Sequence, residues 1–363
     1  MKFLTDLSLY LHVPFCKKKC AYCDFYSGVV TDEMLDKYTN SLIESVKQWG
    51  GKISRPIDTL YLGGGTPSLL NHRILPLLNA VRQNFKVKEN AEITLECNPQ
   101  PNIKEILQNA KKAGVNRISI GAQSGNDGML KTLGRTHKAQ DVVNAVNVAR
   151  SLNFSNVSLD LMIGLPNSDL HTLKADLDFI TNLNPEHVSA YILKIEPQTA
   201  FYKLKSSLNL PDDDSVSDQY LFMCEYLEQR GFSHYEISNF CKEGKHSAHN
   251  LKYWRCEEYL GLGPSAHSFL CGKRFFYPKD LKAFLNGNQP LPDGTGGELA
   301  EQIMLRLRLK EGIPTDILPK KALEKCLEFQ KHRLVNMQNG RLWLTDKGML
   351  VSNAIITEIT EVF

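Results

Sequence analysis

Short apolar runs rich in β-forming residues alternate with amphipathic stretches as far as residue 193. The apolar runs cover residues 7–13, 57–62, 92–97, 117–121, 157–164 and 187–193. Between them, apolar residues recur at helical spacing in segments 32–50, 102–115, 137–154 and 168–183. Strands that alternate with helices form parallel sheets, because each helix carries the chain back to the starting edge. The alternation therefore predicts an α/β fold with six parallel strands.

Right-handed connections would curl such a sheet into a partial parallel (β/α)6 barrel. Strand order cannot be read from the sequence, so a doubly wound sheet is the alternative. In both architectures the functional side chains gather at the carboxyl ends of the strands. We expect residues 1–235 to form this domain and to carry the site at that edge.

The pattern changes after residue 200. Residues 208–219 are polar and acidic, which predicts a solvated loop, and Pro211 precedes a probable helix N-cap. The helix that follows is expected to stop at Gly231. Residues 236–290 are aromatic and loop-rich, and we expect them to form a connecting segment.

Residues 291–363 are predicted to form a C-terminal α+β domain that is winged-helix-like. Two helical segments precede a hairpin signal at Asn339-Gly340, and a last helix is expected from Asp346. Winged helices often bind DNA, but the net charge is only +3 and no basic recognition face is apparent. No nucleic-acid partner is therefore predicted.

The apolar runs are all shorter than the roughly 20 residues that a membrane-spanning helix needs. Asp6 interrupts the N-terminal apolar stretch, and no small-residue cleavage site precedes the first cysteine, which argues against a signal peptide. A cytoplasmic location is expected. Peripheral membrane association and a homodimer are both left open by the sequence.

Nine cysteines are present, and three of them are clustered in "CKKKCAYC" as Cys16, Cys20 and Cys23. The other six have no regular spacing, so the sequence does not predict a disulfide framework. They are Cys97, Cys224, Cys241, Cys256, Cys271 and Cys326.

Three thiols so close together suggest a metal site that lacks a fourth protein ligand. Structural zinc normally takes four ligands, and the nearest further candidate, His12, lies on the preceding strand. A redox dithiol would use Cys20 and Cys23 and leave Cys16 unexplained. The spacing favours an iron–sulfur cluster in which one iron keeps an open position.

Polar or glycine-rich motifs follow the other predicted strands. "GGGTPS" begins at residue 63, Glu96 lies in "LECNP", Gln123 lies in "GAQS", and Asp160 lies in the fifth strand. The sixth strand ends near Tyr191 and Lys194. Because the carboxyl ends of parallel strands share one edge, these residues are expected to surround the cysteine loop.

Together these motifs resemble the radical S-adenosylmethionine (SAM) enzymes. The resemblance is strongest to the branch that contains oxygen-independent coproporphyrinogen III oxidase and the HemW-type haem chaperones, and it runs over nearly the whole chain. The motifs that carry it include "LYLHVPF", "YLGGGTPS", "LECNP", "SIGAQS", "LGRTH", "DLMIGLP", "HVSAYILKIEP", "YEISNF", "HNLKYW" and "YLGLGPSAHSF".

The resemblance implies that Cys16, Cys20 and Cys23 ligate three irons of a [4Fe–4S] cluster. The fourth iron would bind the amino and carboxylate groups of S-adenosylmethionine. One electron from the reduced cluster would then split this cofactor into methionine and a 5′-deoxyadenosyl radical. The positions that match cofactor-binding residues of the family are Tyr10, Tyr22, Gly64, Gly65, Thr66, Glu96, Gln123, Arg135 and Asp160.

One position departs from the oxidase pattern. The oxidase branch carries a further cysteine two residues after the third, and Phe25 stands there in this chain. The haem chaperones share this replacement and an H-N-x-x-Y-W motif that is linked to haem binding in the family. That motif is present as His249, Asn250, Tyr253 and Trp254.

The role of His249 has two interpretations. An imidazole can be an axial ligand of haem iron, and flanking aromatic rings can cover a porphyrin face. A lone histidine can equally be a structural residue in a packed corner. Other candidate ligands in the same segment are His246, His267, Cys241 and Cys256.

The resemblance implies a haem chaperone that holds a [4Fe–4S] cluster and S-adenosylmethionine, binds haem as cargo and delivers it to haem-requiring apoproteins. An electron donor for the cluster is a further expected partner. Such a protein is expected to cleave S-adenosylmethionine but to lack coproporphyrinogen III oxidase activity. The alternatives are a true coproporphyrinogen III oxidase and a radical enzyme with a different substrate.

Overall fold

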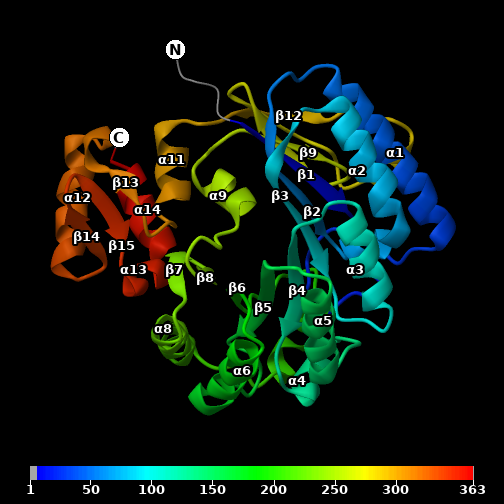
Figure 1. Cartoon of the computed structure of the whole chain (residues 1–363). Helices are drawn as coiled ribbons and strands as arrows, with labels where there is room; N and C mark the ends of the chain where they lie inside the picture. The colour runs from blue at the N-terminus through cyan, green and yellow to red at the C-terminus, as the bar shows by residue number, and fades with distance from the viewer. Residues whose placement is uncertain (1–5, 363) are drawn as a thin grey trace.

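The computed structural model describes residues 6–362 and is built around one large curved sheet (Figure 1). Its six central strands are parallel and lie side by side in chain order. They are β1 (Leu7–Val13), β2 (Ile57–Gly64), β3 (Val87–Cys97), β4 (Arg117–Gln123), β5 (Val157–Ile163) and β6 (His187–Ile192). The predicted α/β fold is therefore confirmed. A doubly wound sheet is excluded, because its strand order would reverse part-way along the sheet.

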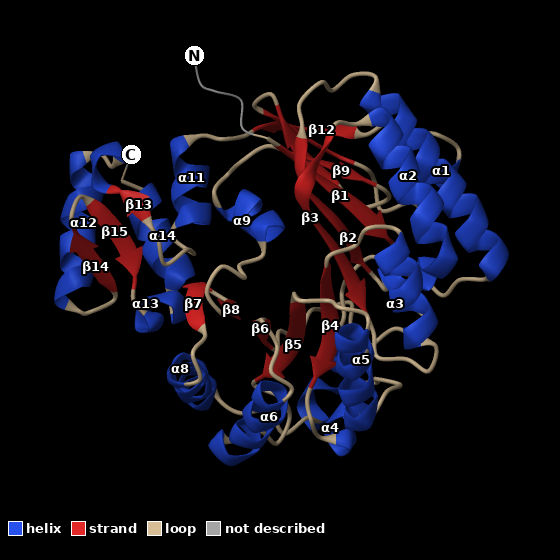
Figure 2. Cartoon of the chain, in the orientation of Figure 1, coloured by secondary structure: helices blue, strands red, loops and turns tan. Residues whose placement is uncertain are grey.

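The connecting helices cover the convex face of the sheet, as Figure 2 shows. They are α1 (Asp32–Gly50), α2 (Ile74–Asn84), α3 (Ile103–Lys112), α4 (Asp127–Thr132), α5 (Ala139–Ser151) and α6 (Leu170–Asn182). Alternate residues of β1, such as Leu9 and Leu11, are buried in the core that these helices share with the sheet. The intervening Tyr10 and His12 lie on the opposite, concave face, since side chains alternate along a strand.

Helix α1 illustrates why the predicted boundaries hold. The side chain of Thr31 accepts a hydrogen bond from the Met34 backbone N–H, which caps the first turn. Leu35, Leu42 and Val46 then recur at helical spacing and are buried in the core. Local capping and periodicity thus specify the helix before any tertiary contact is considered.

The sheet continues beyond both edges of the six central strands. Next to β1 lie β9 (Tyr259–Leu262), β10 (His267–Leu270), β11 (Lys273–Phe276) and β12 (Leu291–Thr295). Next to β6 lie β8 (Asn239–Cys241) and β7 (Ser233–Glu236). The barrel is partial because β1 and β6 pair with these added strands and not with each other.

Segment 236–290, which the sequence predicts to be a loop-rich connection, also contributes to the main sheet. It supplies β8, β9, β10 and β11 to the main sheet, while β7 and β12 lie across or just beyond its ends. These strands are only three to five residues long, and they join the central strands through the pairs β9–β1 and β8–β6. The division of the chain into domains at residues 235 and 290 stays a prediction.

Helix α9 (Ala248–Trp254) comes from the same segment and lies inside the curve of the sheet (Figure 1). The Glu92 carboxylate of β3 accepts hydrogen bonds from the backbone N–H groups of Ala248 and His249 at the start of this helix. Helix α9 thus covers part of the concave face at the β1–β3 end of the barrel.

The acidic stretch 208–219 is a loop only in its first part. The Asp212 side chain accepts from the Ser215 backbone N–H and caps α8 (Asp213–Gln229). The loop prediction is therefore wrong from residue 213 onward, although the expected cap after Pro211 and the helix end before Gly231 are confirmed. Acidic side chains in a first helical turn favour the helix electrostatically.

The C-terminal module has its own three-stranded sheet in the order β13-β15-β14. Its elements are α11 (Leu299–Arg306), β13 (Ile313–Pro314), α12 (Lys320–Lys331), β14 (Val335–Gln338), β15 (Arg341–Leu344), α13 (Asp346–Leu350) and α14 (Ser352–Thr360). The hairpin at Asn339-Gly340 is confirmed. The single last helix is wrong, because Val351 separates α13 from α14.

Short helices complete the secondary structure. They are α7 (Ala200–Leu204), α10 (Leu281–Leu285) and the 3-10 turns Pro67–Arg73, Lys205–Ser207 and Thr315–Ile317. Within residues 6–362, none of the helices combines the length and the apolar character that a membrane crossing requires.

Candidate cofactor and metal-cluster site

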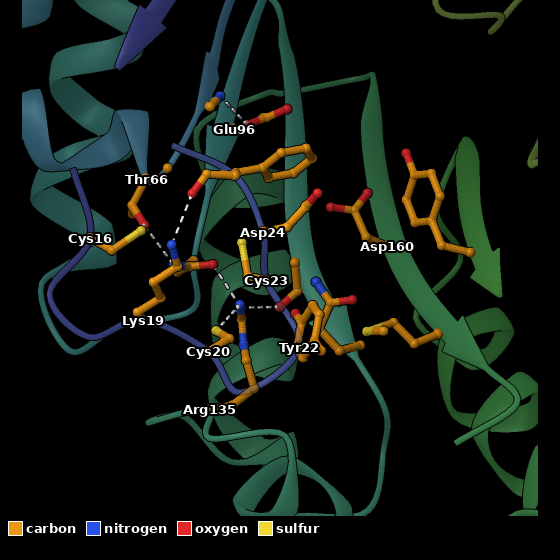
Figure 3. A pocket seen from close by; sticks show the side chains of 18 of the residues that line it. Cys16, Lys19, Cys20, Tyr22, Cys23, Asp24, Thr66, Glu96, Arg135 and Asp160 are labelled. Carbon is orange, nitrogen blue, oxygen red and sulfur yellow. Dashed lines mark hydrogen bonds between the residues drawn. The ribbon is translucent and has the colours of Figure 1, made fainter. Parts of the chain in front are cut away.

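A cavity of about 440 Å³ opens at the carboxyl ends of the central strands (Figure 3). Each of the six strands, or the loop that follows it, contributes to the lining. The residues named from the sequence that line it are Cys16, Cys20, Tyr22, Cys23, Phe25, Gly64, Gly65, Thr66, Glu96, Cys97, Gln123, Arg135, Asp160, Tyr191 and Lys194. The fold therefore gathers these segments at one edge, as the parallel strands predict.

The cysteine loop is closed at its base by main-chain hydrogen bonds. The Cys16 N–H donates to the Gly28 carbonyl at 2.9 Å, and the Gly28 N–H donates to the Pro14 carbonyl at 3.0 Å. The three cysteines are free thiols of intermediate exposure. Burial raises the pKa of the Cys23 thiol, which means that a bound cation is needed to favour its thiolate.

Two donors approach the sulfurs of this loop. The Thr66 hydroxyl lies 3.5 Å from Cys16 Sγ, and Arg135 Nη1 lies 3.5 Å from Cys20 Sγ. Figure 3 shows both side chains turned toward the cysteines. Hydrogen-bond donors around thiolate sulfur stabilise negative charge and tune the potential of iron–sulfur centres.

The number of thiols in the loop bears on the kind of metal site. The loop supplies three free thiols, whereas structural zinc normally takes four protein ligands. Three thiolates leave one coordination position open, which is the donor set expected of a cluster with one open iron.

The glycine turn after β2 brings backbone close to the cysteine loop. A side chain at Gly65 would place its Cβ 2.5 Å from the Phe15 carbonyl oxygen. Gly64 has a φ of +116°, and a Cβ there would meet the His12 ring at 2.7 Å. Glycine is required at both positions, because no other residue permits this close approach.

Glu96 is held in place at the end of β3 by two donors. Its carboxylate accepts from the Tyr61 hydroxyl at 2.8 Å and from the Gly64 N–H at 3.1 Å. Burial, opposed by the Tyr61 hydrogen bond and reinforced by the Asp160 charge, raises the pKa of Glu96 to about 7. Glu96 therefore faces the cavity as a carboxyl group that exchanges its proton near neutral pH.

Asp160 and Arg135 complete the polar wall. Asp160 accepts from the Ser119 hydroxyl at 3.0 Å, and burial raises its pKa to about 6. Arg135 Nη2 donates to Asn98 Oδ1 at 2.7 Å and to the Gly121 carbonyl at 2.8 Å. These contacts fix a guanidinium at the cavity wall.

Tyr10 is an exception among the nine predicted cofactor-binding residues. It does not line the cavity: its hydroxyl lies 2.9 Å from His12 Nδ1, and its ring packs beside Tyr61 and His249. Because side chains alternate along β1, Tyr10 lies on the same concave face but further from the carboxyl end than His12. A role for Tyr10 in cofactor binding therefore stays a prediction.

Sequence reasoning missed Asn98. Its amide donates to the Thr66 hydroxyl at 3.0 Å and its oxygen accepts from Arg135, so it links the two side chains that approach the cysteine sulfurs. The signal was present, because Asn98 is part of the "LECNP" motif two residues after Glu96. An asparagine that both donates and accepts suits this linking position.

His249 is a buried, hydrogen-bonded residue in this structure, and its role as a haem ligand stays a prediction. The side chain is 1% exposed, its Nδ1 lies 2.9 Å from the Thr59 hydroxyl, and its Nε2 lies 2.7 Å from the Tyr253 hydroxyl. The ring also stacks on Tyr61 at 5.1 Å, and burial lowers its pKa to about 3. Both ring nitrogens are therefore engaged, and in this conformation neither is available to iron.

The rest of the motif belongs to the same packed corner. The Tyr253 ring meets Tyr259 edge-on at 4.5 Å, and Trp254 lies under the Arg308 guanidinium at 5.9 Å. Asn250 is half-buried in α9, beside them. The motif thus supports the position of α9, as the packing interpretation predicts.

The alternative ligands do not join the cavity either. His246 and His267 are exposed, Cys241 is buried and Cys256 is half-buried. None of these four residues lines the cavity around the cysteine loop.

Comparisons with known proteins agree with this geometry. Residues 10–180 match the radical SAM superfamily, and residues 298–351 match the HemN C-terminal domain. The heme chaperone HemW of Bacillus subtilis (strain 168) is 33% identical over 369 residues, which cover 96% of this chain and 97% of that protein. The heme chaperone HemW of a Synechocystis species is 34% identical over 99% of this chain and 92% of its own length.

The chain belongs to the HemW family.

The family match also accounts for the fold. Coproporphyrinogen III oxidase (HemN) from Escherichia coli, a radical SAM enzyme, superimposes with a TM-score of 0.86 over 99% of this HemW-family chain and 91% of the HemN chain. The two sequences are 22% identical, so this likeness shows the fold alone. It confirms a partial barrel of the radical SAM type with an added C-terminal module.

Proposed function

We propose that this chain is a haem chaperone that holds a [4Fe–4S] cluster and S-adenosylmethionine. The single observation that carries the proposal is the shared cavity: three thiols, a glycine turn, polar side chains of β3, β4 and β5 and the Arg135 guanidinium line one space. Its partners would be haem, haem-receiving apoproteins and an electron donor for the cluster. The cysteine ligands would be Cys16, Cys20 and Cys23.

The donor set fits a cluster with one open iron. Three thiolates supply three ligands, and Phe25 stands where a further cysteine would otherwise follow. Reductive cleavage of a sulfonium is the chemistry that such a cluster supplies with S-adenosylmethionine when both are bound. The Thr66 hydroxyl and the Arg135 guanidinium would stabilise the negative charge on the cysteine sulfurs.

The remaining wall residues would bind and orient the nucleotide cofactor. The backbone at Gly64 and Gly65 is free of side chains and can approach an amino acid moiety closely. The Glu96 and Asp160 carboxyl groups are acceptors suited to hydroxyl and amino groups, and Gln123 adds an amide at the same wall. Tyr22 would shield the site from solvent.

The carrier role is supported by the names of the relatives and by Phe25. The full-length relatives are called heme chaperones. In this chain an apolar ring, which cannot act as a thiol, stands at the position where the oxidase branch has its extra cysteine. We therefore favour haem carriage over decarboxylation of coproporphyrinogen III.

The test is a paired assay on one preparation. The protein is purified without oxygen, its cluster is reconstituted, and samples receive either haem or coproporphyrinogen III with S-adenosylmethionine and a reductant. We expect stoichiometric haem binding, transfer of haem to an apoprotein, and no protoporphyrinogen. Formation of protoporphyrinogen would refute the chaperone assignment, as would a complete lack of haem binding.

A further inference from the structure

We propose that an acidic one-electron carrier protein docks beside the cysteine loop, over Lys17 and Lys18, and passes its electron to the cluster at the Cys20 corner. This inference rests on the proposed function, which requires an electron donor, and it adds the surface that the donor contacts and the charge that the donor carries. The carrier would be oxidised by one electron and the cluster reduced by one, and no covalent bond would form or break.

The first observation is a second cavity, of about 290 Å³, that adjoins the cofactor cavity. Cys20 and Arg135 line both cavities. Among the described residues, Cys16 and Cys23 line the cofactor cavity but not the second one. Cys20 is therefore the cysteine at which a bound cluster could be approached without entering the space proposed for S-adenosylmethionine.

The "LGRTH" motif, residues 133–137, packs directly on the cysteine loop at this corner. The Ala21 N–H donates to the Leu133 carbonyl at 3.1 Å, and Arg135 Nη1 lies 3.5 Å from Cys20 Sγ. A Cβ added at Gly134 would lie 3.3 Å from the Ala21 nitrogen, so main chain of the two loops meets closely. Electron transfer slows steeply with distance, and this close packing keeps the second cavity near the Cys20 sulfur.

The second cavity carries more positive than negative charge. Lys17, Lys18 and Arg135 line it, together with a single carboxylate, Asp141. Burial lowers the pKa of His137 to about 4, so this ring is neutral at neutral pH and does not alter the balance. An excess of positive charge at a docking surface attracts an acidic partner and raises its rate of association.

The two lysines are available to a partner protein. Both side chains are exposed. In the part of the chain that the structure describes, neither ammonium group forms an ion pair. A carboxylate from another protein could therefore pair with either lysine without breaking an intramolecular salt bridge. Lys19 differs, because its Nζ donates to the Phe25 carbonyl at 3.2 Å.

The recess continues beyond the second cavity, which suits a protein surface better than a small ion. A further cavity of about 500 Å³ shares Lys17 and Gln100 with the second one. Gln100 Nε2 is buried and has no hydrogen-bond partner among the described residues, so it is an unused donor. Arg73 in the further cavity is already paired with Asp36 at 2.5 Å, so the lysines supply the free positive charge.

The experiment compares two reductants on the full-length, cluster-reconstituted protein. Reduced plant-type ferredoxin is the acidic carrier protein, and reduced methyl viologen is a small cation that needs no docking surface. Reduction of the cluster is followed by stopped-flow loss of its visible absorbance at low salt. The double variant Lys17→Glu, Lys18→Glu is compared with Lys320→Glu, Lys321→Glu, a matched change at exposed positions in the first turn of α12, where acidic residues are tolerated.

The loop variant should be reduced about tenfold more slowly by ferredoxin and no more slowly by methyl viologen. The control variant should behave like the wild type with both reductants. Added salt should slow the reaction of the wild type with ferredoxin, because it screens the attraction. The affinity for oxidised ferredoxin, measured by titration, is a readout independent of electron transfer and should fall in the loop variant alone.

An unchanged ferredoxin rate in the loop variant would overturn the docking site and leave the haem-chaperone function intact. Equal slowing with both reductants would also overturn it, because the change would then lie in the cluster itself. So would failure of ferredoxin to reduce a wild-type cluster that methyl viologen reduces. A wild-type protein that forms no cluster or binds no haem would instead refute the proposed function, so the two failures are distinguishable.

Discussion

At the residue scale, the cysteine loop lies beside hydrogen-bond donors that the sequence does not reveal. Cys16 and Cys20 each meet a donor from a distant segment, Thr66 and Arg135, and Asn98 links those two donors. The type and spacing of the three cysteines could be read from the sequence. Their surroundings could not, because these depend on which loops meet at the strand ends.

Replacing any one cysteine of the loop should abolish the cluster. Cys16→Ala, Cys20→Ala or Cys23→Ala should each remove the visible thiolate-to-iron absorbance after reconstitution. The loop offers only three thiol ligands, and the cluster needs all three. Iron content and absorbance are the measurements. Cys271→Ala is the control, because Cys271 is exposed and does not line the cavity. Retained iron in all three loop variants would show that the ligands lie elsewhere.

Glu96 predicts a pH-dependent loss of stability in the protein without its cofactors. Burial raises its pKa to about 7, above its ordinary value of 4.5, so its contribution to folding stability is fully present below about pH 4.5. As pH rises toward 7, the unfolded state ionises first and this stability is lost, by about 1–3 kcal/mol after allowance for the open cavity. Glu96→Gln keeps a hydrogen-bond acceptor for Tyr61 and cannot ionise.

The measurement is thermal or urea unfolding of the wild type and Glu96→Gln at pH 5 and pH 8. The wild type should lose more stability than the variant between the two values. Equal losses would mean that the carboxylate is solvated well enough to ionise without cost.

At the element scale, α9 shows how a motif can serve packing. The helix begins at Ala248, where Glu92 accepts two backbone N–H groups, and His249 connects it to Thr59 on β2. The short helix has little intrinsic stability in isolation, so these contacts hold it inside the curve of the sheet. Its residues are therefore expected to affect stability more than cargo binding.

His249→Ala should destabilise the fold by about 2–4 kcal/mol, because it leaves a cavity and removes a partner from the Thr59 and Tyr253 hydroxyls. Haem affinity per folded molecule should be unchanged. Unfolding curves and haem titrations of the same preparation check both statements. A selective loss of haem affinity without loss of stability would show that His249 binds haem.

At the scale of the whole molecule, the C-terminal module is joined to the sheet through β7. The Ile237 N–H donates to the Arg308 carbonyl at 2.9 Å, and the Lys310 N–H donates to the Tyr235 carbonyl at 3.0 Å. These two hydrogen bonds form the seam between β7 and the C-terminal module. Asp346 lies on the module side of this seam and pairs with both His234 and Lys310. The hydrogen bond from His234 and the Lys310 charge hold the pKa of Asp346 well below its ordinary value.

Asp346→Asn should weaken this seam modestly, by about 1 kcal/mol, since the carboxylate is partly exposed and its ion pair with Lys310 is screened. The low pKa means that the contribution is present above about pH 3.8 and is lost as pH falls further. The melting temperature of the variant at pH 7 should fall by a few degrees. An unchanged melting temperature would show that main-chain contacts alone hold the module.

The sequence determined the six central strands, the helices between them and the cysteine spacing, because capping, periodicity and loop motifs act over a few neighbouring residues. It also carried the family resemblance. Tertiary structure alone decided three matters. The short hairpin strands β7–β12 join the main sheet through the distant pairings of β8 with β6 and of β9 with β1. Tyr10 lies away from the cavity because of its place on β1. His249 is committed to Thr59, 190 positions away in sequence, since burial leaves no water to satisfy its ring nitrogens.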